Sequence, residues 1–393
     1  MTPFGRAMLA HWQLDPAITY LNHGTVGATP RRVLAAQQAI RDEIERNPAR
    51  FLLRELTGVA VGAPRAERPR LRRAADAVAA FVGARGDDLV FVDNATTGIN
   101  AVLRSLPWGS GEEILVTDQG YGAITNAAAL VAREHGAAVR VLELPYPECD
   151  PGRVLEAYDR ALGPRTRLVI ADHITSESAL VLPVAEIVAR CQARGALVLI
   201  DGAHAPGVLP LDVPRLGADW YVGNLHKWAW APRSCGFLWA PPKRQAGLHP
   251  PVVSWGLDQA FTLEFDWVGT RDPSPWLAAP VGIEFQRELG LEAIRAHNHG
   301  LAWEAARLLA ERWGTRLAVA EEMIGAMATL PLPPRAGSTK EDAARLRDAL
   351  LFEDRIEVQL HAWGGRLWVR VSAQVYNERS DYERLAEAVA ARI

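Results

Sequence analysis

The chain has 393 residues, and its 43 Lys and Arg against 46 Asp and Glu leave a net charge of −3. This length exceeds the roughly 100–200 residues of a typical domain, so the chain can form one large domain and a smaller one. The near-neutral charge implies no basic face for nucleic acid, and a hydrophobic share of 49% excludes disorder of the whole chain.

Short apolar runs alternate with helical periodicity over the first two thirds of the chain. In chain order the runs predict strands at 88–92, 113–117, 139–144, 167–172, 196–201, 218–223 and 235–239. The periodicity between them predicts helices at 74–81, 98–106, 124–135 and 184–194. Short strands of this composition are typical of a parallel sheet buried on both faces, and repeated β-α-β units predict a doubly wound α/β domain. Its ligands should lie at the carboxyl ends of the strands.

The pattern changes after about residue 280. Residues 280–313 predict long helices, and 356–360 and 367–371 predict strands of a smaller α+β domain. Two segments rich in Gly and Pro, 58–70 and 330–338, predict a mobile loop and a connector. We therefore expect a large domain at residues 31–279 and a small C-terminal domain at 280–393.

Three cysteines, Cys149, Cys191 and Cys235, lie far apart and form no CxxC pair, so we expect neither a disulfide framework nor a metal site. The first fifteen residues contain no apolar segment of a secretion signal. No apolar run approaches the ~18–20 residues of a membrane span. We expect a cytoplasmic protein without membrane or nucleic-acid partners.

Two strand ends carry the strongest chemical signal. The run ALVLID ends in Asp201, and the run ADWYVG is followed by Asn-Leu-His and then Lys227. A carboxylate at the end of an apolar strand is costly unless it meets a cation, for which a pyridinium nitrogen would serve. A lysine that loses its proton can form a Schiff base. Asp201 and Lys227 therefore indicate pyridoxal 5′-phosphate (PLP); a helix cap and a surface lysine are the alternative interpretations.

The segments around these residues, DGAHAPG and NLHKWAWAPRSCG, resemble the core of class V (cysteine-desulfurase-like) PLP enzymes of fold type I. More narrowly they resemble the isopenicillin N epimerase-like branch. The resemblance runs from LNHG at 21–24 to RVSAQVYN at 370–377. It implies a large mostly parallel sheet domain, a smaller α+β C-terminal domain, and an N-terminal segment, residues 1–30, that lies over the active site.

A phosphate group needs donors, and the segment DNATTGIN follows a strand and opens a helix. The resemblance assigns the phosphate to Ala95, Thr96 and Thr97, with further contacts from Asn224 and His226. Asn224 stands where many members have Ser. Simple threonine capping of the helix is the alternative interpretation.

The resemblance also assigns residues to the cofactor ring. It places Tyr121 against the pyridine face, where a flat ring adds contact area. His204 matches a position near the ring or its O3′ oxygen, and Thr175 falls near the position that bonds O3′, where desulfurases carry Asn. A core tyrosine and a satisfied core histidine are the alternatives for Tyr121 and His204.

An amino-acid carboxylate calls for a guanidinium, whose fork binds it bidentately. The resemblance places Arg370 in that role, although a surface ion pair is the alternative. Asn22 and His23 resemble the segment that reaches over the substrate. Thr270 lies in a loop that resembles the one lent to the neighbouring subunit's phosphate, which implies a homodimer.

The resemblance leaves several reactions open, because fold does not decide chemistry. A typical desulfurase needs a mobile cysteine late in the chain, and the last cysteine is Cys235. We expect an enzyme acting at the α carbon of an amino acid, most of all an epimerase, with a C–S (β) lyase or an aminotransferase as alternatives. Lys227 is the expected base; Tyr121, His204 and His23 are candidates for the second proton donor. A non-catalytic binding module is disfavoured because both Lys227 and Asp201 are present.

Overall fold

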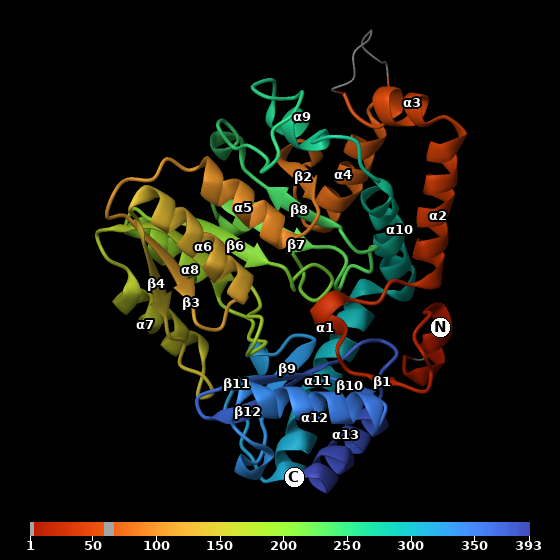
Figure 1. Cartoon of the computed structure of the whole chain (residues 1–393), viewed down its shortest axis with the longest axis vertical. Helices are drawn as coiled ribbons and strands as arrows, with labels where there is room; N and C mark the ends of the chain where they lie inside the picture. Colours follow the sequence, from red (N-terminus) through yellow and green to blue (C-terminus); the bar gives the residue numbers. More distant parts are fainter. Residues whose placement is uncertain (1–3, 59–66) are drawn as a thin grey trace.

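A seven-stranded sheet organises the larger part of the chain in the computed structural model, which describes residues 4–58 and 67–393 (Figure 1). The order across the sheet is β2-β8-β7-β6-β5-β3-β4. The strands are β2 (Leu89–Val92), β3 (Glu113–Thr117), β4 (Ala138–Leu142), β5 (Thr166–Asp172), β6 (Leu197–Gly202), β7 (Trp220–Asn224) and β8 (Gly236–Trp239). All seven predicted strands are therefore confirmed.

Alternating side chains along each strand bury both faces of this sheet. Val90 and Val92 face one apolar cluster, whereas Leu89 and Phe91 face the other. The first cluster is covered by α5 (Ala95–Ser105), α6 (Gly122–His135) and α9 (Phe261–Asp266). The second is covered by α4 (Arg70–Phe81), α7 (Pro151–Ala161), α8 (Val184–Ala193) and α10 (Ser274–Leu289). The result is the three-layer α/β arrangement that the sequence predicts.

Two strands depart from the expected parallel, doubly buried pattern. β8 runs antiparallel to both β2 and β7, because it follows β7 through a loop too short for a helical crossover. β4 forms one edge of the sheet, and its Ala138, Arg140 and Val141 are exposed. The sheet is thus mostly parallel, as expected, with one antiparallel strand inside it.

The small domain contains two further sheets. β9 (Met327–Pro331), β11 (Gln359–Trp363) and β12 (Arg366–Ser372) form an antiparallel sheet in the order β11-β12-β9. β9 includes the first two residues of the predicted 330–338 connector. The helices α11 (Leu291–Trp313), α12 (Lys340–Phe352) and α13 (Arg379–Arg392) pack on these strands and on one another.

The N-terminal segment is part of the small domain's second sheet. Its strand β1 (Thr19–Tyr20) pairs in parallel with β10 (Ile356–Glu357), and the short helix α1 (His23–Val26) follows it. Two more helices, α2 (Arg31–Arg46) and α3 (Pro48–Arg50), lead to the large domain. α10 contacts α2 and α4, so the predicted boundary at residue 280 falls inside a helix that packs on the large domain.

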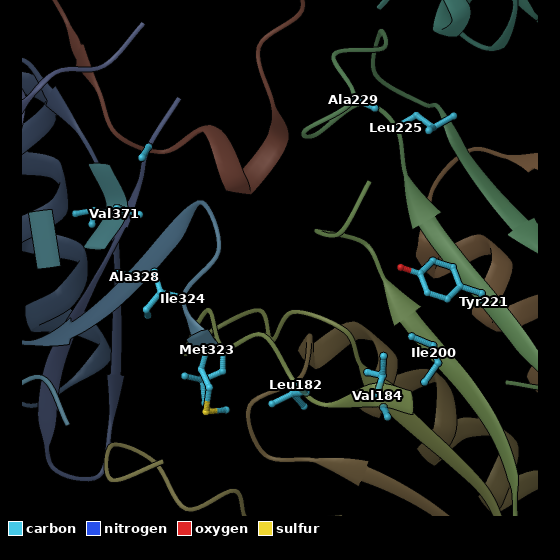
Figure 2. Packing of buried hydrophobic residues seen from close by; sticks show 14 of the residues in the cluster. Leu182, Val184, Ile200, Tyr221, Leu225, Ala229, Met323, Ile324, Ala328 and Val371 are labelled. Atoms are coloured by element: carbon cyan, nitrogen blue, oxygen red, sulfur yellow. The ribbon is translucent and has the colours of Figure 1, made fainter. Parts of the chain in front are cut away.

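A continuous apolar core joins the two domains (Figure 2). Met323 of the small domain lies beside Leu182 of the large one, and Ile324 forms an isolated antiparallel bridge with Leu180. The Val181 N–H donates to the Met323 carbonyl at 2.8 Å. This packing fixes the small-domain sheet against the carboxyl ends of the large-domain strands.

Most of the predicted mobile loop at 58–70 lies outside the described residues, which resume at Glu67. Across the two described ranges no helix has the length and apolar character that a membrane crossing requires.

Candidate active site

A cavity of about 430 Å³ lies at the carboxyl ends of β5, β6 and β7, where the small domain and α1 face the large domain. Many of the predicted site residues line it: Ala95, Thr96, Tyr121, Asp201, His204, Asn224, His226, Lys227 and Arg370. The structure therefore gathers residues from segments nearly 300 positions apart into one place, as a doubly wound sheet does for its ligands.

Lys227 lies in the turn that follows β7, and its side chain reaches the cavity. The sequence contains only two other lysines, Lys243 and Lys340, and both are exposed. Burial and, to a smaller extent, the charge of the nearby Arg370 lower the pKa of Lys227 to about 7, while Asp201 opposes the change. A substantial neutral fraction at neutral pH makes this amine a nucleophile and a base.

The backbone around Lys227 is held from two sides. His23 bonds the Lys227 carbonyl through Nε2 at 3.0 Å, and its Nδ1 lies 2.7 Å from the Tyr376 hydroxyl. Gly27 and Gly207 have positive φ angles and lie so close that a Cβ would clash with the carbonyls of His226 and Trp228. Glycine is therefore required at both positions for the lysine turn to pack as it does.

Asp201 is the next-to-last residue of β6, and it is buried. One oxygen accepts the N–H of Ala203 at 2.9 Å. Burial raises the pKa of Asp201, whereas the Ala203 hydrogen bond and the positive charge of Lys227 oppose this increase. A buried carboxylate with this surrounding stabilises a cation that enters the cavity.

His204 lies between Lys227 and Trp228. Its Nε2 is 3.1 Å from the Lys227 Nζ, and its Nδ1 accepts the indole N–H of Trp228 at 3.4 Å. Burial lowers the pKa of His204 well below its ordinary value, with the charges of Lys227 and Arg370 adding to the effect. The ring is therefore neutral at neutral pH.

The start of α5 faces the same cavity with part of its donors already used. The N–H of Ala95 donates to Asn224 Oδ1 at 2.8 Å, and that of Thr97 donates to the cap residue Asn94 at 2.9 Å. Thr96 lines the cavity, and its N–H is one of the first four helix N–H groups, which have no partner within the helix. Thr97 lies outside the lining.

His226 and Tyr121 complete the large-domain wall. His226 Nδ1 bonds the Cys235 carbonyl at 2.9 Å, and burial lowers the pKa of its imidazole to about 4. Tyr121 precedes α6 with its side chain 54% exposed at the cavity. An exposed aromatic ring at this place is free to stack on a flat ligand.

The structure places Thr175 away from the cavity. Its hydroxyl lies 2.8 Å from the Ser178 hydroxyl and accepts the Leu180 N–H at 2.7 Å, so the turn itself uses it. The neighbouring Ser176 and Glu177 line the cavity instead. The sequence prediction was therefore one residue away from the side chain that reaches the site.

Arg370 comes from β12 and is buried against the N-terminal segment. It donates to the Thr25 hydroxyl at 2.7 Å and to the carbonyl of Ser176, and its Nε has no protein partner among the described residues. Burial lowers the pKa of Arg370 to about 10, whereas Glu177 opposes the decrease. A desolvated guanidinium with an unused donor suits an incoming carboxylate.

Besides Thr97 and Thr175, three more predicted residues lie outside the cavity lining. Asn22 donates to Glu357 at 2.8 Å, and His23 holds the Lys227 carbonyl as described above. Asn22 and His23 therefore hold the segments around the cavity in place without lining it. Thr270 is exposed, and its neighbour Arg271 donates to Asp93 at 3.0 Å.

Sequence reasoning missed several lining residues, namely Asp172, Ser176, Glu177, Gln359 and His361. Gln359 is the register partner of Arg370, and His361 follows it by two residues on the same strand. The alternation of side chains along a strand could have placed this pair on one face. Burial and the charge of Arg370 lower the pKa of His361 to about 3, and its Nε2 is buried without a partner in the described structure.

Comparison with known proteins places this fold and site in context. Residues 20–348 match the family Aminotransferase class-V. The chain is 36% identical to the isopenicillin N epimerase of Streptomyces clavuligerus, over 96% of this chain and 95% of that protein. It is 32% identical to a probable chloroplastic L-cysteine desulfhydrase of Arabidopsis thaliana, over 95% of this chain and 83% of that protein.

Among solved structures, a mutant of the cystine C–S lyase C-DES with glycine covalently linked to its PLP cofactor shares the fold. It aligns with a TM-score of 0.77 at 22% identity, over 98% of each chain. The fold is thus that of fold type I PLP enzymes. The chain belongs to the class V aminotransferase family, and it is a PLP-dependent enzyme.

The side chains of the cavity fit this cofactor. A cationic pyridine nitrogen suits the buried Asp201, and an aldehyde suits a lysine amine whose pKa is about 7. A phosphate suits the free Thr96 N–H at the start of α5 and the side-chain amide of Asn224. His226 can donate to a phosphate only when its ring is protonated, because the Cys235 carbonyl uses its Nδ1 hydrogen.

We expect Lys227→Ala to abolish the visible absorbance of lysine-bound cofactor and its fixation to the protein by borohydride, because no other lysine is buried. The matched control Lys243→Ala changes an exposed lysine and should leave both signals intact. Peptide mapping after borohydride reduction identifies the labelled residue; label on Lys243 or Lys340 would contradict the assignment.

Cofactor uptake by the apo enzyme should accelerate as pH rises toward about 7, since the neutral amine of Lys227 is the form that reacts with the aldehyde.

Proposed function

We propose that the enzyme moves the α proton of an amino acid and that its reaction is amino-acid epimerisation. The observation that supports the proposal most directly is the Lys227 amine, with its lowered pKa, in one cavity with Asp201 and Arg370. Whole-length similarity to isopenicillin N epimerases is consistent with it.

In this proposal the cofactor, when bound, serves as the electron sink that makes the α proton acidic. Asp201 keeps the pyridine nitrogen charged. Thr96 and Asn224 hold the phosphate, joined by His226 when its ring is protonated. Tyr121 stacks on the ring, and Arg370 binds the substrate carboxylate with its free donor. Lys227, once released from the cofactor, takes the proton from the α carbon at Nζ.

Epimerisation needs a second proton carrier on the other face of the substrate. Of the three candidates from the sequence, His23 is excluded from direct contact because it lies behind Lys227 with both ring nitrogens bonded. Tyr121 and His204 both line the cavity. Both ring nitrogens of His204 have hydrogen-bond partners, whereas the Tyr121 hydroxyl has none among the described residues. We assign the second proton to Tyr121.

A second candidate, C–S β-elimination, is favoured by the size of the cavity. At about 430 Å³ it lies at the lower end of the ~300–1,000 Å³ of typical ligand sites, and the cofactor occupies part of it. A compact substrate such as cysteine fits this space better than a bulky one. Relatives named as cysteine desulfhydrases agree with this alternative.

Persulfide chemistry of the desulfurase type is not part of the proposal. The three cysteines are buried, and burial raises the pKa of each thiol. None lines the cavity. A thiol that stays protonated and enclosed does not attack a substrate sulfur.

Incubation with a panel of L-amino acids in D₂O tests the two reactions. We expect deuterium at the α carbon together with the D-isomer, measured by NMR and chiral chromatography, and neither product with Lys227→Ala. Pyruvate and ammonia without D-isomer would replace epimerisation by β-elimination. Conversion of the cofactor to its amine form would indicate transamination, and the absence of α exchange with every substrate would overturn both.

Arg370→Ala should weaken the use of α-carboxylate substrates by about 2–5 kcal/mol in kcat/KM, because a buried charge pair is lost. The effect should be much smaller for the corresponding amino-acid amides, which lack the carboxylate. Arg366→Ala, on the same strand but outside the cavity lining, is the matched control. Equal losses with acids and amides would count against the carboxylate role.

We propose further that the active unit is a homodimer in which Thr270 binds the partner's cofactor phosphate. Thr270 is exposed and does not line the cavity of its own chain. The nearby segment 252–257 exposes Val252, Val253, Trp255 and Leu257, an apolar surface that suits a subunit contact.

Mixed dimers test this arrangement. Thr270→Ala should weaken cofactor affinity about 10–100-fold, the equivalent of one charge-assisted hydrogen bond. Dimers that combine Thr270→Ala with Lys227→Ala subunits should regain one intact site if Thr270 acts in trans. At limiting cofactor, the mixed dimers should retain more lysine-bound cofactor than dimers of Thr270→Ala alone. If they do not, Thr270 does not act in trans.

A further inference from the structure

Two buried carboxyl groups lie side by side at the carboxyl edge of the sheet. Asp172 ends β5 and is the register partner of Asp201 on β6. Their residues are 7% and 5% exposed, and both line the cavity. Within residues 4–58 and 67–393 neither forms an ion pair with Lys or Arg within 4 Å. Two uncompensated anions in this position would repel each other strongly.

The surroundings of the two carboxyl groups differ in a way that decides which one is charged. Asp201 accepts a backbone N–H from Ala203, and the charge of Lys227 favours its ionised form. Asp172 accepts the Thr117 hydroxyl at 3.0 Å and a hydrogen bond from its own backbone, and both favour its ionised form, whereas Asp201 disfavours it. Burial, then the charge of Asp201, raises the pKa of Asp172 to about 8.

The other groups near Asp172 supply no positive charge. From α7, the buried Tyr158 hydroxyl interacts with Asp172 electrostatically and has no hydrogen-bond partner in the described structure. The next residue, His173, is turned to the Tyr221 hydroxyl at 3.0 Å, and burial lowers the pKa of its ring to about 4. Lys227 is the cation that acts on Asp201.

We propose that Asp172 carries a proton at neutral pH and serves as a positioning residue that keeps Asp201 ionised for the cofactor's pyridine nitrogen. The neutral carboxyl of Asp172 donates its O–H toward Asp201 and accepts from Thr117, so the pair holds one negative charge and one proton. A single negative charge matches the single positive charge of a pyridinium. The inference rests on the proposed role of Asp201 as the partner of that nitrogen.

The first test measures the apo protein and needs no turnover. An acid whose pKa is raised in the folded state keeps a proton that the unfolded chain releases above about 4, so its contribution to stability falls as pH rises. Buried histidines such as His173 and His226 oppose this change in the wild type, but they titrate alike in the wild type and in Asp172→Asn. We therefore expect the thermal midpoint of Asp172→Asn relative to that of the wild type to increase between pH 4 and pH 8. A difference that stays constant over this range would overturn the proposal.

The second test compares Asp172→Asn with Asp172→Ala in the holoenzyme. An amide keeps a neutral donor and an acceptor, whereas alanine removes both, so Asn should lose clearly less kcat/KM than Ala. Loss of an outer partner of this kind costs ~10–100-fold in comparable sites. The asparagine variant should also lack the decline of activity above pH 8 that ionisation of Asp172 causes. Equal losses in the two variants would mean that the negative charge of Asp172 is what matters, which contradicts the proposal.

Asp201→Asn separates this inference from the proposed function. Full turnover of Asp201→Asn would contradict the role of Asp201, whereas the apo stability profile of Asp172→Asn would still report whether Asp172 holds a proton. If Asp172→Ala does not fold, the asparagine variant and the pH profile decide the question alone.

Discussion

The desolvation of charge at the carboxyl edge of the sheet is the constraint on which the rest of the site depends. Asp201 and Lys227 are both removed from water, and each has a shifted pKa because of it. In solution a lysine would be protonated and an aspartate ionised whatever surrounded them. Burial makes their protonation depend on neighbours instead, so that Asp172, His204 and Arg370 can each tune the pair.

The N-terminal segment contacts two of the residues whose charge is desolvated in this way, Lys227 and Arg370. β1 is bonded to β10, and the Ser372 N–H donates to the Leu21 carbonyl, so the segment moves with the small domain. From there His23 holds the Lys227 carbonyl and Thr25 accepts from Arg370. The residue proposed to bind the carboxylate and the residue proposed to take the proton are therefore linked through one short helix. A shift of the small domain would change both together.

Much of the fold was predictable, because runs of Val, Ile and Leu between helical stretches indicate buried strands whatever their neighbours. The direction of β8 was not, since the composition of a run contains no information on whether a crossover or a short loop precedes it. The predicted connector begins two residues too early, at Leu330, because Pro331 and its neighbours suggest a break, although prolines are tolerated at the end of an edge strand such as β9.

The residues of the active site were likewise predictable only in part. Asp201 and Lys227 were recognisable from strand ends and from a family resemblance, and the structure brings both into the cavity. Thr175 was assigned from the family resemblance alone, which contains no information on the direction of a side chain in a turn; that direction depends on the turn's own hydrogen bonds, here those of Thr175 with Ser178 and Leu180. Asp172 went unnoticed because its significance arises only from the register of β5 on β6.

The hydrogen bonds of His204 extend the same electrostatic argument to the lysine. An indole N–H only donates, so the bond from Trp228 requires His204 Nδ1 to accept. In a neutral imidazole the hydrogen then lies on Nε2, which faces the Lys227 Nζ at 3.1 Å. His204 Nε2 then donates to Lys227 Nζ, and Nζ can accept this hydrogen bond only as a neutral amine with a free lone pair. Trp228 and His204 therefore favour the same neutral form of Lys227 that burial favours, and the positive charge beside Asp201 that a neutral lysine does not provide is left for the cofactor to supply.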